Sequence, residues 1–187
     1  MTNNYFSFIS LIMSSYNFQH YPQFFTATIL EWKHLLKPDE YKQIIIDSLL
    51  FLKKERSIVV NAFVIMPNHI HLIWHIQDNY SREKIQLRFL KYTAQQMKFR
   101  LIDTKNSALQ NYLVNASDRQ YQFWERNPLS VDLWDKNVLI QKLIYIHNNP
   151  LSHPWNLANY PEEYKYSSAL FYEEGIDLFG LITHYDD

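Results

Sequence analysis

Hydrophobic and polar residues follow two different periods along this chain, and these periods predict where strands and helices lie. Residues 24–32 read FFTATILEW, a β-branched and aromatic run with partial alternation, which predicts a strand. Residues 57–66, SIVVNAFVIM, predict a second strand. Pro67 and Asn68 then predict a turn into a third strand that begins at His69, so the second and third strands form a hairpin.

Three segments have the apolar period of amphipathic helices. The first begins at Pro38, because a proline followed by acids suits the first turn of a helix. The second covers residues 81–100, with Ser81 as its N-cap. The third, residues 136–150, reads KNVLIQKLIYIHNNP and ends at its proline. We expect the buried faces of the second and third helices to include Ile85, Phe89, Tyr92, Leu139, Leu143 and Ile146.

The order of these elements predicts the fold class. Between the second and third helices, the polar residues 103–119 predict an irregular connection, and residues 121–126, YQFWER, predict a short fourth strand. The order is then strand, helix, strand, strand, helix, strand, helix. An antiparallel sheet of about four strands with helices packed on it, of the split βαβ or ferredoxin-like kind, accommodates this order. The sequence therefore predicts an α+β fold.

Composition narrows the classes of function. The chain of 187 residues has no cysteine, which excludes disulfides and thiolate metal sites and fits a reducing cytosol. Its two glycines, Gly175 and Gly180, leave no glycine-rich phosphate loop, so no nucleotide cofactor is expected. No Lys or Arg precedes Lys33, and no apolar run reaches the roughly 18 residues of a membrane helix. We therefore expect a cytoplasmic protein with no membrane partner.

Charge is unevenly distributed, although the net charge is only −1. Residues 81–100 hold six bases against the single acid Glu83, whereas residues 161–187 hold seven acids against the single base Lys165. A near-neutral chain with one basic segment is compatible with nucleic acid binding, but it lacks the strongly basic signature of a typical DNA-binding protein. Charge alone does not select a partner.

Two histidines stand one residue apart in the third strand. His69 and His71 are at positions i and i+2, so both imidazoles point to the same face of the strand and form half of a metal site. Because the chain has eight histidines, a chance pair with this spacing is also common. The spacing by itself leaves both interpretations open.

The third predicted helix can supply further polar groups. Gln141, Tyr145 and Asn149 are at positions i, i+4 and i+8, so they share one helix face and place a hydroxyl beside an amide oxygen. The chain has 14 tyrosines, and Tyr145 could equally pack its ring in the core. A metal held by two imidazoles needs at least one more protein ligand, which this helix could provide.

Three blocks of sequence, AFVIMPNHIHLIW, YIHNNP and PEEYKYSSALFY, occur in this order and resemble the single-tyrosine HUH transposases of insertion sequences, including REP-associated tyrosine transposases. The resemblance covers about Phe24 to Tyr172. It implies an HUH fold of the ferredoxin-like or RRM-like kind, with His69 and His71 as metal ligands, Tyr145 as nucleophile and Asn149 as the third ligand.

The implied activity is metal-dependent nicking and strand transfer of single-stranded DNA through a 5′-phosphotyrosine. The implied cofactor is Mg²⁺ or Mn²⁺, and the implied partner is a hairpin-forming single-stranded DNA. Two alternatives stay open: a domesticated DNA- or RNA-binding module without turnover, and a metal-dependent hydrolase of small phosphate esters. A monomer and a homodimer that shares its sites are both compatible with the sequence.

The resemblance also sets the expected domain boundaries. They are an N-terminal extension of uncertain order at 1–22, a single catalytic domain at 23–172 and an acidic C-terminal tail at 173–187. Because the first residues match no part of the family pattern, translation could begin at Met1 or at Met13.

Weaker candidates lie outside the three blocks. Bases of the second helix could contact the DNA backbone, or they could form an ordinary solvated face. Lys142 could contact DNA, and it or Gln141 could orient the tyrosine. Some tryptophans could stack on bases, although tryptophans more often pack in a core. The candidate bases of the helix are Arg82, Lys84, Arg88, Lys91 and Lys98, and the tryptophans are Trp74, Trp124, Trp134 and Trp155.

Overall fold

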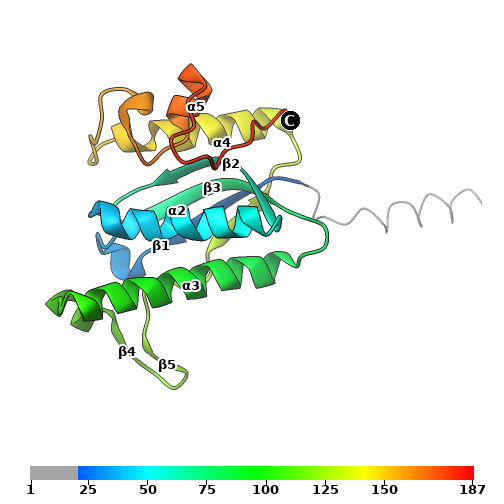
Figure 1. Ribbon diagram of the computed structural model, residues 1–187. Helices are drawn as coiled ribbons and strands as arrows, with labels where there is room; N and C mark the ends of the chain where they lie inside the picture. The colour runs from blue at the N-terminus through cyan, green and yellow to red at the C-terminus, as the bar shows by residue number, and fades with distance from the viewer. Residues whose placement is uncertain (1–20) are drawn as a thin grey trace, which may run out of the picture.

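A four-stranded antiparallel sheet forms the centre of the protein, with strands in the order β2-β3-β1-β6 (Figure 1). The computed structural model describes residues 21–187. The sheet and helices confirm the predicted α+β class. The main elements are β1 (Gln23–Thr28), α2 (Asp39–Lys54), β2 (Ile58–Ile65), β3 (His69–Ile76), α3 (Arg82–Asp103), β6 (Leu129–Asp132), α4 (Lys136–Asn148) and α5 (Ala169–Glu174).

Short elements connect these segments. A hairpin of β4 (Leu113–Ala116) and β5 (Arg119–Tyr121) extends from α3 on the side of the sheet away from α4 (Figure 1). The 3-10 turns are η2 (Leu30–Trp32), η3 (Ser107–Tyr112), η4 (Asn149–Leu151) and η5 (Pro161–Glu163).

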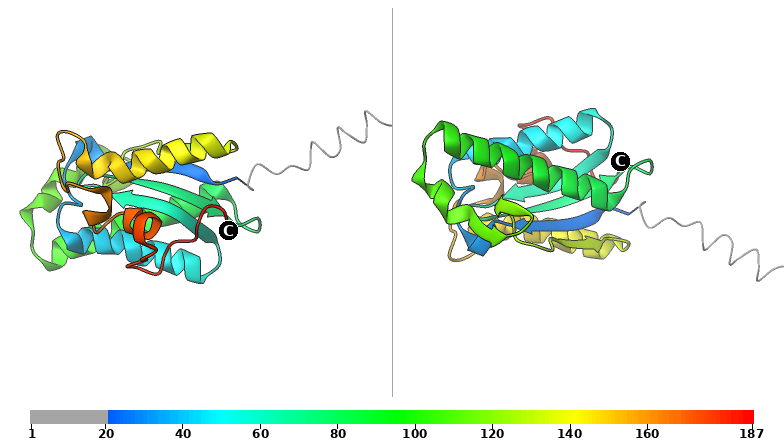
Figure 2. Two further views of the ribbon diagram at one scale, coloured as in Figure 1. Left: turned by 90° about the horizontal axis from the view of Figure 1, so that it is seen from above. Right: turned by 90° about the horizontal axis from the view of Figure 1, so that it is seen from below.

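Helices cover the two faces of the sheet, and the alternation of β3 determines which side chains meet which helix. Ile70, Leu72 and Trp74 point into a core with residues of α2 and α3. Ile73 points to the other face and packs with Leu139, Leu143 and Ile146 of α4. Figure 2 shows α3 from one side of the sheet and α4 from the other. Since His69 and His71 have the same parity as Ile73, they lie on the α4 face.

The predicted helices are confirmed, with one error in a buried face. Pro38 is the N-cap of α2, and the Ser81 hydroxyl accepts a hydrogen bond from the Lys84 amide at the start of α3. Ile85 and Phe89 are buried as expected, but Tyr92 is 47% exposed, and the polar Thr93 lies inside in its place. Thr93 is tolerated there because its hydroxyl donates to the Phe89 carbonyl oxygen.

The first strand is shorter than the sequence predicts. β1 pairs with β3 from Gln23 to Thr28, and its last partner is His69, the first residue of β3. Beyond this point no partner strand continues, so the chain leaves the sheet and forms η2. Glu31 and Trp32 there have φ angles of 55° and 56°, in the left-handed region.

The fourth strand of the sheet is β6, not the predicted segment 121–126. Within that segment, Trp124 makes only an isolated bridge to Ile29, which lies between β1 and the turn η2. β6 has four residues at the edge of the sheet, and Leu129 and Val131 are 54% and 42% exposed. A short exposed edge strand has no run of buried residues, so its sequence carries little signal.

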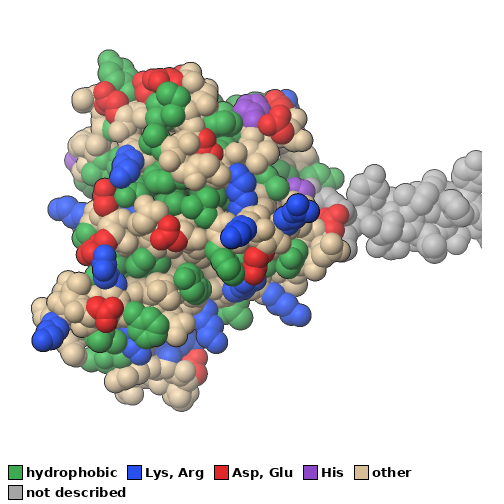
Figure 3. Space-filling view, viewed as in Figure 1, with side chains coloured by type: hydrophobic (Ala, Val, Ile, Leu, Met, Phe, Trp, Pro, Cys, Tyr) green, Lys and Arg blue, Asp and Glu red, His purple; other side chains and the backbone are tan. Residues whose placement is uncertain are grey.

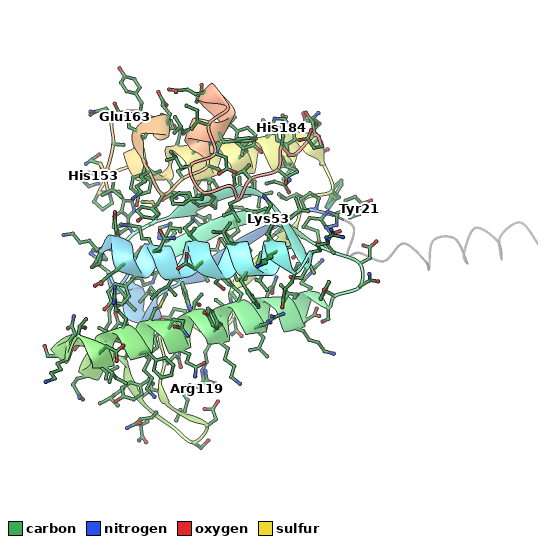
Figure 4. All side chains as sticks on the ribbon, in the orientation of Figure 1. Tyr21, Lys53, Arg119, His153, Glu163 and His184 are labelled. Carbon is green, nitrogen blue, oxygen red and sulfur yellow. The ribbon has the colours of Figure 1, made fainter. Side chains whose placement is uncertain are left out.

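The acidic segment 173–187 lies against the edge strand β2. Leu181 is fully buried, the Thr183 amide donates to the Val60 carbonyl oxygen, and Lys53 donates to the Gly180 carbonyl oxygen. In Figure 4, Lys53 lies on α2, and His184 of the C-terminal segment lies above it. The segment therefore belongs to the packed structure and covers one edge of the sheet.

The predicted N-terminal extension and the expected lack of a membrane helix are two separate points. The predicted N-terminal extension lies outside the described residues, except for Tyr21 and Pro22. Within residues 21–187, no helix combines the length and apolar character needed to cross a bilayer.

Candidate active site

A cavity of about 380 Å³ lies between the α4 face of the sheet and the C-terminal end of α4. His69, His71, Tyr145 and Asn149 all line it, so the structure brings together four residues that the sequence places in two distant segments. Its other lining residues are Thr26, Thr28, Trp32, Ile144, Asn148, Ser152 and Trp155.

The two histidines lie side by side on the floor of this cavity. Their ring centroids are 4.7 Å apart, and both side chains are buried. The register of the sheet places Thr28 of β1 opposite His69 and Thr26 opposite His71. Paired residues on neighbouring strands share a face, so the two threonines also face the cavity.

Hydrogen bonds fix the orientation of the His69 ring. Asn68 donates its Nδ2 to the Trp32 carbonyl oxygen, at 3.2 Å, which leaves its Oδ1 as an acceptor. This Oδ1 is 2.6 Å from Nδ1 of His69, so Nδ1 is the protonated ring nitrogen. The lone pair of a neutral His69 is then on Nε2, which is the arrangement a metal ligand requires.

His71 is held from the neighbouring strand. The Thr26 hydroxyl lies 2.7 Å from its Nδ1, and the Phe24 ring stacks on its ring with centroids 5.2 Å apart. Its Nε2 is buried and has no hydrogen-bond partner within residues 21–187. A buried nitrogen without a partner is costly, and such atoms in native structures often mark a place for an ion or water.

Burial keeps both imidazoles neutral. It lowers the pKa of His69 to about 4, against a smaller opposing effect of the Asn149 side chain. Burial also lowers the pKa of His71 to about 3, helped by the nearby charges of His69 and Lys142. Neutral imidazoles have free lone pairs near pH 7, and a ligand must have one.

Tyr145 stands beside His71 on the exposed side of the cavity. The centroids of the two rings are 5.2 Å apart, and Tyr145 is 49% exposed. The alternative that Tyr145 packs in the core is therefore wrong. One turn earlier on α4, the Lys142 ammonium lies 5.7 Å from the centroid of the Tyr145 ring and 4.8 Å from that of Phe24.

Asn149 caps the C-terminus of α4 and completes the cavity wall. Its side chain is buried, and its Oδ1 has no hydrogen-bond partner in the described part of the chain. Residues 21–187 contain no cluster of three or more His, Asp or Glu side chains that could hold a metal. A cation here would be held by two imidazoles and one amide oxygen, and the unpartnered atoms of His71 and Asn149 fit that set.

Gln141 does not reach this cavity. It is exposed on α4 and is not among the residues that line the cavity. Among the described residues, no contact supports the predicted orienting role of Gln141, whereas Lys142 contacts the Tyr145 ring.

The basic helix α3 lies on the other face of the sheet. Several of its bases contact acids or aromatic rings: Arg82 pairs with Asp132 at 2.6 Å, Arg88 pairs with Glu55 at 2.7 Å, and Lys98 lies over Tyr121. In the view of Figure 3, acidic and basic side chains are interspersed over the surface around α2 and α3. Arg119 of the adjoining hairpin is far from His153 and Glu163, which follow α4 (Figure 4). DNA contact by α3 stays a prediction, and it concerns a surface separate from the cavity.

Of the four candidate stacking tryptophans, only one lines the cavity. Trp74 and Trp124 are buried in the core, and Trp124 donates to the Thr93 hydroxyl. Trp134 is 74% exposed and does not line the cavity, whereas Trp155 does.

Sequence reasoning missed several cavity residues, among them Trp32 and Thr26. Trp32 was assigned to a continuing strand, and its place depends on where β1 stops. Thr26 had a signal in its strand parity, but its partner could be identified only from the register between β1 and β3.

No family model matches this chain, and no curated protein matches it. Among solved structures, it is similar to a REP-associated tyrosine transposase bound to a REP hairpin, with a TM-score of 0.60 and 16% identity over 89% of this chain and 88% of the other. A transposase candidate from Deinococcus radiodurans aligns with a TM-score of 0.46 and 15% identity, over 68% of this chain and 91% of the other. The first likeness confirms the predicted HUH-type fold.

Proposed function

We propose that this protein nicks single-stranded DNA and transfers strands through a 5′-phosphotyrosine at Tyr145, as a transposase of the HUH type. The observation that carries the proposal is the meeting of an exposed phenol, two neutral imidazoles and an unpartnered amide oxygen at one cavity. The fold shared with a transposase that is itself bound to a REP hairpin supports the choice of substrate.

His69, His71 and Asn149 would hold the divalent cation. Two imidazole nitrogens and an amide oxygen suit Mn²⁺ and accept Mg²⁺. A cation bound there would offset the negative charge that develops on a scissile phosphate. Asn68 and Thr26 would keep the two rings oriented from behind, through their contacts with the two Nδ1 atoms.

Tyr145 supplies the nucleophile. Its phenolic oxygen forms a bond to phosphorus, and the bond from phosphorus to the 3′ oxygen breaks. The phenolic proton is lost, and the departing 3′ oxygen takes up a proton to become a hydroxyl. Because the phosphodiester energy is retained in the phosphotyrosine, the reverse attack by a 3′-hydroxyl can join a new strand without a nucleotide cofactor.

Lys142 is a basic residue close to the nucleophile. Its ammonium contacts the Tyr145 ring from one turn away on the same helix. A positive charge at this distance attracts the phosphate and offsets the negative charge that develops during the attack. In this proposal, Lys142 serves both as a positioning residue for Tyr145 and as a contact for DNA.

The test is covalent attachment to single-stranded oligonucleotides that form hairpins, in the presence of Mn²⁺ or Mg²⁺. We expect wild-type protein to give an adduct that survives denaturation, and Tyr145→Phe to give none. Tyr92→Phe is the matched control, because Tyr92 is similarly exposed but lies on α3. If Tyr145→Phe forms adduct at the wild-type level, the assignment of the nucleophile is wrong. Hairpin binding without cation-dependent cleavage would instead select the binding module.

A further inference from the structure

Two tryptophans from different parts of the chain border the cavity next to His69. Trp32 comes from η2, and Trp155 comes from the segment after η4. Their ring centroids lie 6.3 Å and 6.1 Å from that of His69, respectively, and both rings line the cavity. Trp32 is 62% exposed, so most of a large apolar side chain faces solvent beside the proposed catalytic groups.

Trp32 is held in this exposed position by an unfavourable backbone conformation. Glu31 and Trp32 are both in the left-handed region, which disfavours residues with a Cβ. Two hydrogen bonds stabilise the turn: the Glu125 carboxylate accepts from the Glu31 amide at 2.6 Å, and Asn68 donates to the Trp32 carbonyl oxygen. Asn68 also holds His69, so the turn and the histidine share one support.

Trp155 is fixed on its own side of the cavity. Its amide donates to the Ser152 carbonyl oxygen at 2.8 Å, and the His34 ring lies tilted beside its ring at 5.4 Å. Trp155 is half-buried, so part of its surface stays available to a ligand.

The lining of the cavity indicates what these rings would bind. Among residues 21–187, the lining has aromatic, hydroxyl, amide and imidazole groups and the aliphatic Ile144, but no Asp, Glu, Lys or Arg side chain. A nucleobase there would meet no charged side chain of this lining, and it would gain most from contact with flat π surfaces. Aromatic side chains stack on nucleobases with little dependence on base identity. In a duplex the bases are stacked on each other, so only an unpaired base can offer its face.

We propose that Trp32 and Trp155 form a stacking site for an unpaired nucleobase next to the phosphate that Tyr145 attacks. The inference rests on the proposed function, because that function makes single-stranded DNA the ligand. It adds a reason for the single-stranded requirement: the nucleotide at the cut must leave a duplex to place its base beside His69.

The experiment measures binding separately from chemistry. In a Tyr145→Phe background, fluorescence anisotropy would give the affinity for single-stranded oligo-dA and oligo-dT, and for an abasic oligonucleotide of equal length. We expect Trp32→Gly and Trp155→Ala each to weaken binding of the base-containing strands by about tenfold or more. Binding of the abasic strand should not change.

Control variants separate stacking from folding. Trp134→Ala removes an exposed tryptophan outside the cavity and should bind like its parent. Glycine adopts the left-handed conformation of residue 32 freely, so Trp32→Gly should keep or raise the Tm while it loses affinity. Trp32→Phe and Trp155→Phe should recover part of the affinity.

The outcomes distinguish this inference from the function on which it rests. If Trp32→Gly and Trp155→Ala bind oligo-dA and oligo-dT like the parent, the stacking site is refuted, even where wild-type protein forms the Tyr145 adduct. Equal losses for the abasic strand would also refute it. The converse result is binding that depends on the two tryptophans while wild-type protein forms no adduct through Tyr145. That result would support the stacking site and refute the proposed nicking and strand transfer.

Discussion

The ring of Tyr145 lies against the ring of His71, with 5.2 Å between their centroids, although one belongs to a late helix and the other to a central strand. Phe24 stacks on the same histidine and also meets Tyr145 edge-on at 6.1 Å. This aromatic contact joins α4 to the sheet and places the proposed nucleophile beside a proposed metal ligand.

Replacement of Lys142 should slow the chemistry without removing the nucleophile. Lys142→Met keeps much of the side-chain length but removes the charge near the Tyr145 ring. We expect the rate of adduct formation to fall by about tenfold or more, because one positioned charge commonly contributes that much. Single-turnover kinetics at saturating DNA would measure it, with partial recovery in Lys142→Arg. Lys91→Met on α3 is the control, and an equal loss there would point to general DNA affinity.

Removal of either histidine should abolish cation binding. His69→Ala and His71→Ala each leave one imidazole and one amide, too few protein ligands for a stable site. Titration calorimetry with Mn²⁺ should show binding to wild-type protein and none to either variant, and a chelator should stop adduct formation in wild type. His153→Ala changes an exposed histidine that does not line the cavity, so it should bind Mn²⁺ normally. Unchanged binding in His71→Ala would place the cation elsewhere.

Asn149 should affect cation affinity more than stability. Its buried Oδ1 has no hydrogen-bond partner among the described residues, so loss of that oxygen removes no internal hydrogen bond from the metal-free protein. We expect Asn149→Ala to lose the Mn²⁺-induced rise in Tm, while Asn149→Asp keeps or increases it through its negative charge. A thermal melt with and without Mn²⁺ measures both effects. An Asn149→Ala protein with the full rise would exclude this residue as a ligand.

Asn68 should act on the metal through His69. Asn68→Ala removes the acceptor that keeps the proton on Nδ1 of His69, and support of this kind is typically worth about 10-fold to 100-fold in metal affinity. Because Asn68 also holds the Trp32 carbonyl, oligonucleotide affinity should fall as well. Competition with a coloured chelator would give the Mn²⁺ affinity. Thr26→Val should weaken Mn²⁺ binding in the same way through His71, without the second effect.

Acid should destabilise the metal-free protein before its carboxylates protonate. Burial lowers the pKa of His69, His71 and His147 to about 4, 3 and 4 in the folded state, against about 6.5 in an unfolded chain. Between these values the unfolded chain binds more protons, so the free energy of unfolding should fall as the pH drops from about 6.5 toward 4. The slope is about 1.4 kcal/mol per pH unit for each histidine.

Urea denaturation at several pH values, with a chelator present, measures this slope. His147 lies outside the cavity lining and contacts the Ser168 hydroxyl at 2.9 Å, which a glutamine could also reach. His147→Gln removes one of the three histidines that take up a proton on unfolding. The slope should therefore fall by the contribution of one histidine. A free energy of unfolding that stays constant from pH 6.5 to 4.5 would contradict the neutral state of these rings.

Part of the fold and site could be predicted from local pattern. Side-chain parity placed His69 and His71 on one face of a strand, and helical spacing placed Tyr145 and Asn149 on one face of α4. The apolar stripes of α2 and α4 and the hairpin at Pro67 are also local features. These relationships depend on a few successive residues, and the backbone geometry of a strand or helix fixes them wherever the element packs.

Only the tertiary structure decided which of these faces meet. The β1–β3 register sets Thr26 opposite His71, the end of β1 places Trp32 at the cavity, and packing puts the basic helix α3 on the far side of the sheet. The short edge strand β6 was missed for the same reason. Strand register and helix placement minimise the exposed apolar area of the whole chain. They therefore depend on residues far apart in sequence, and the hydrophobic period of a single segment cannot predict them.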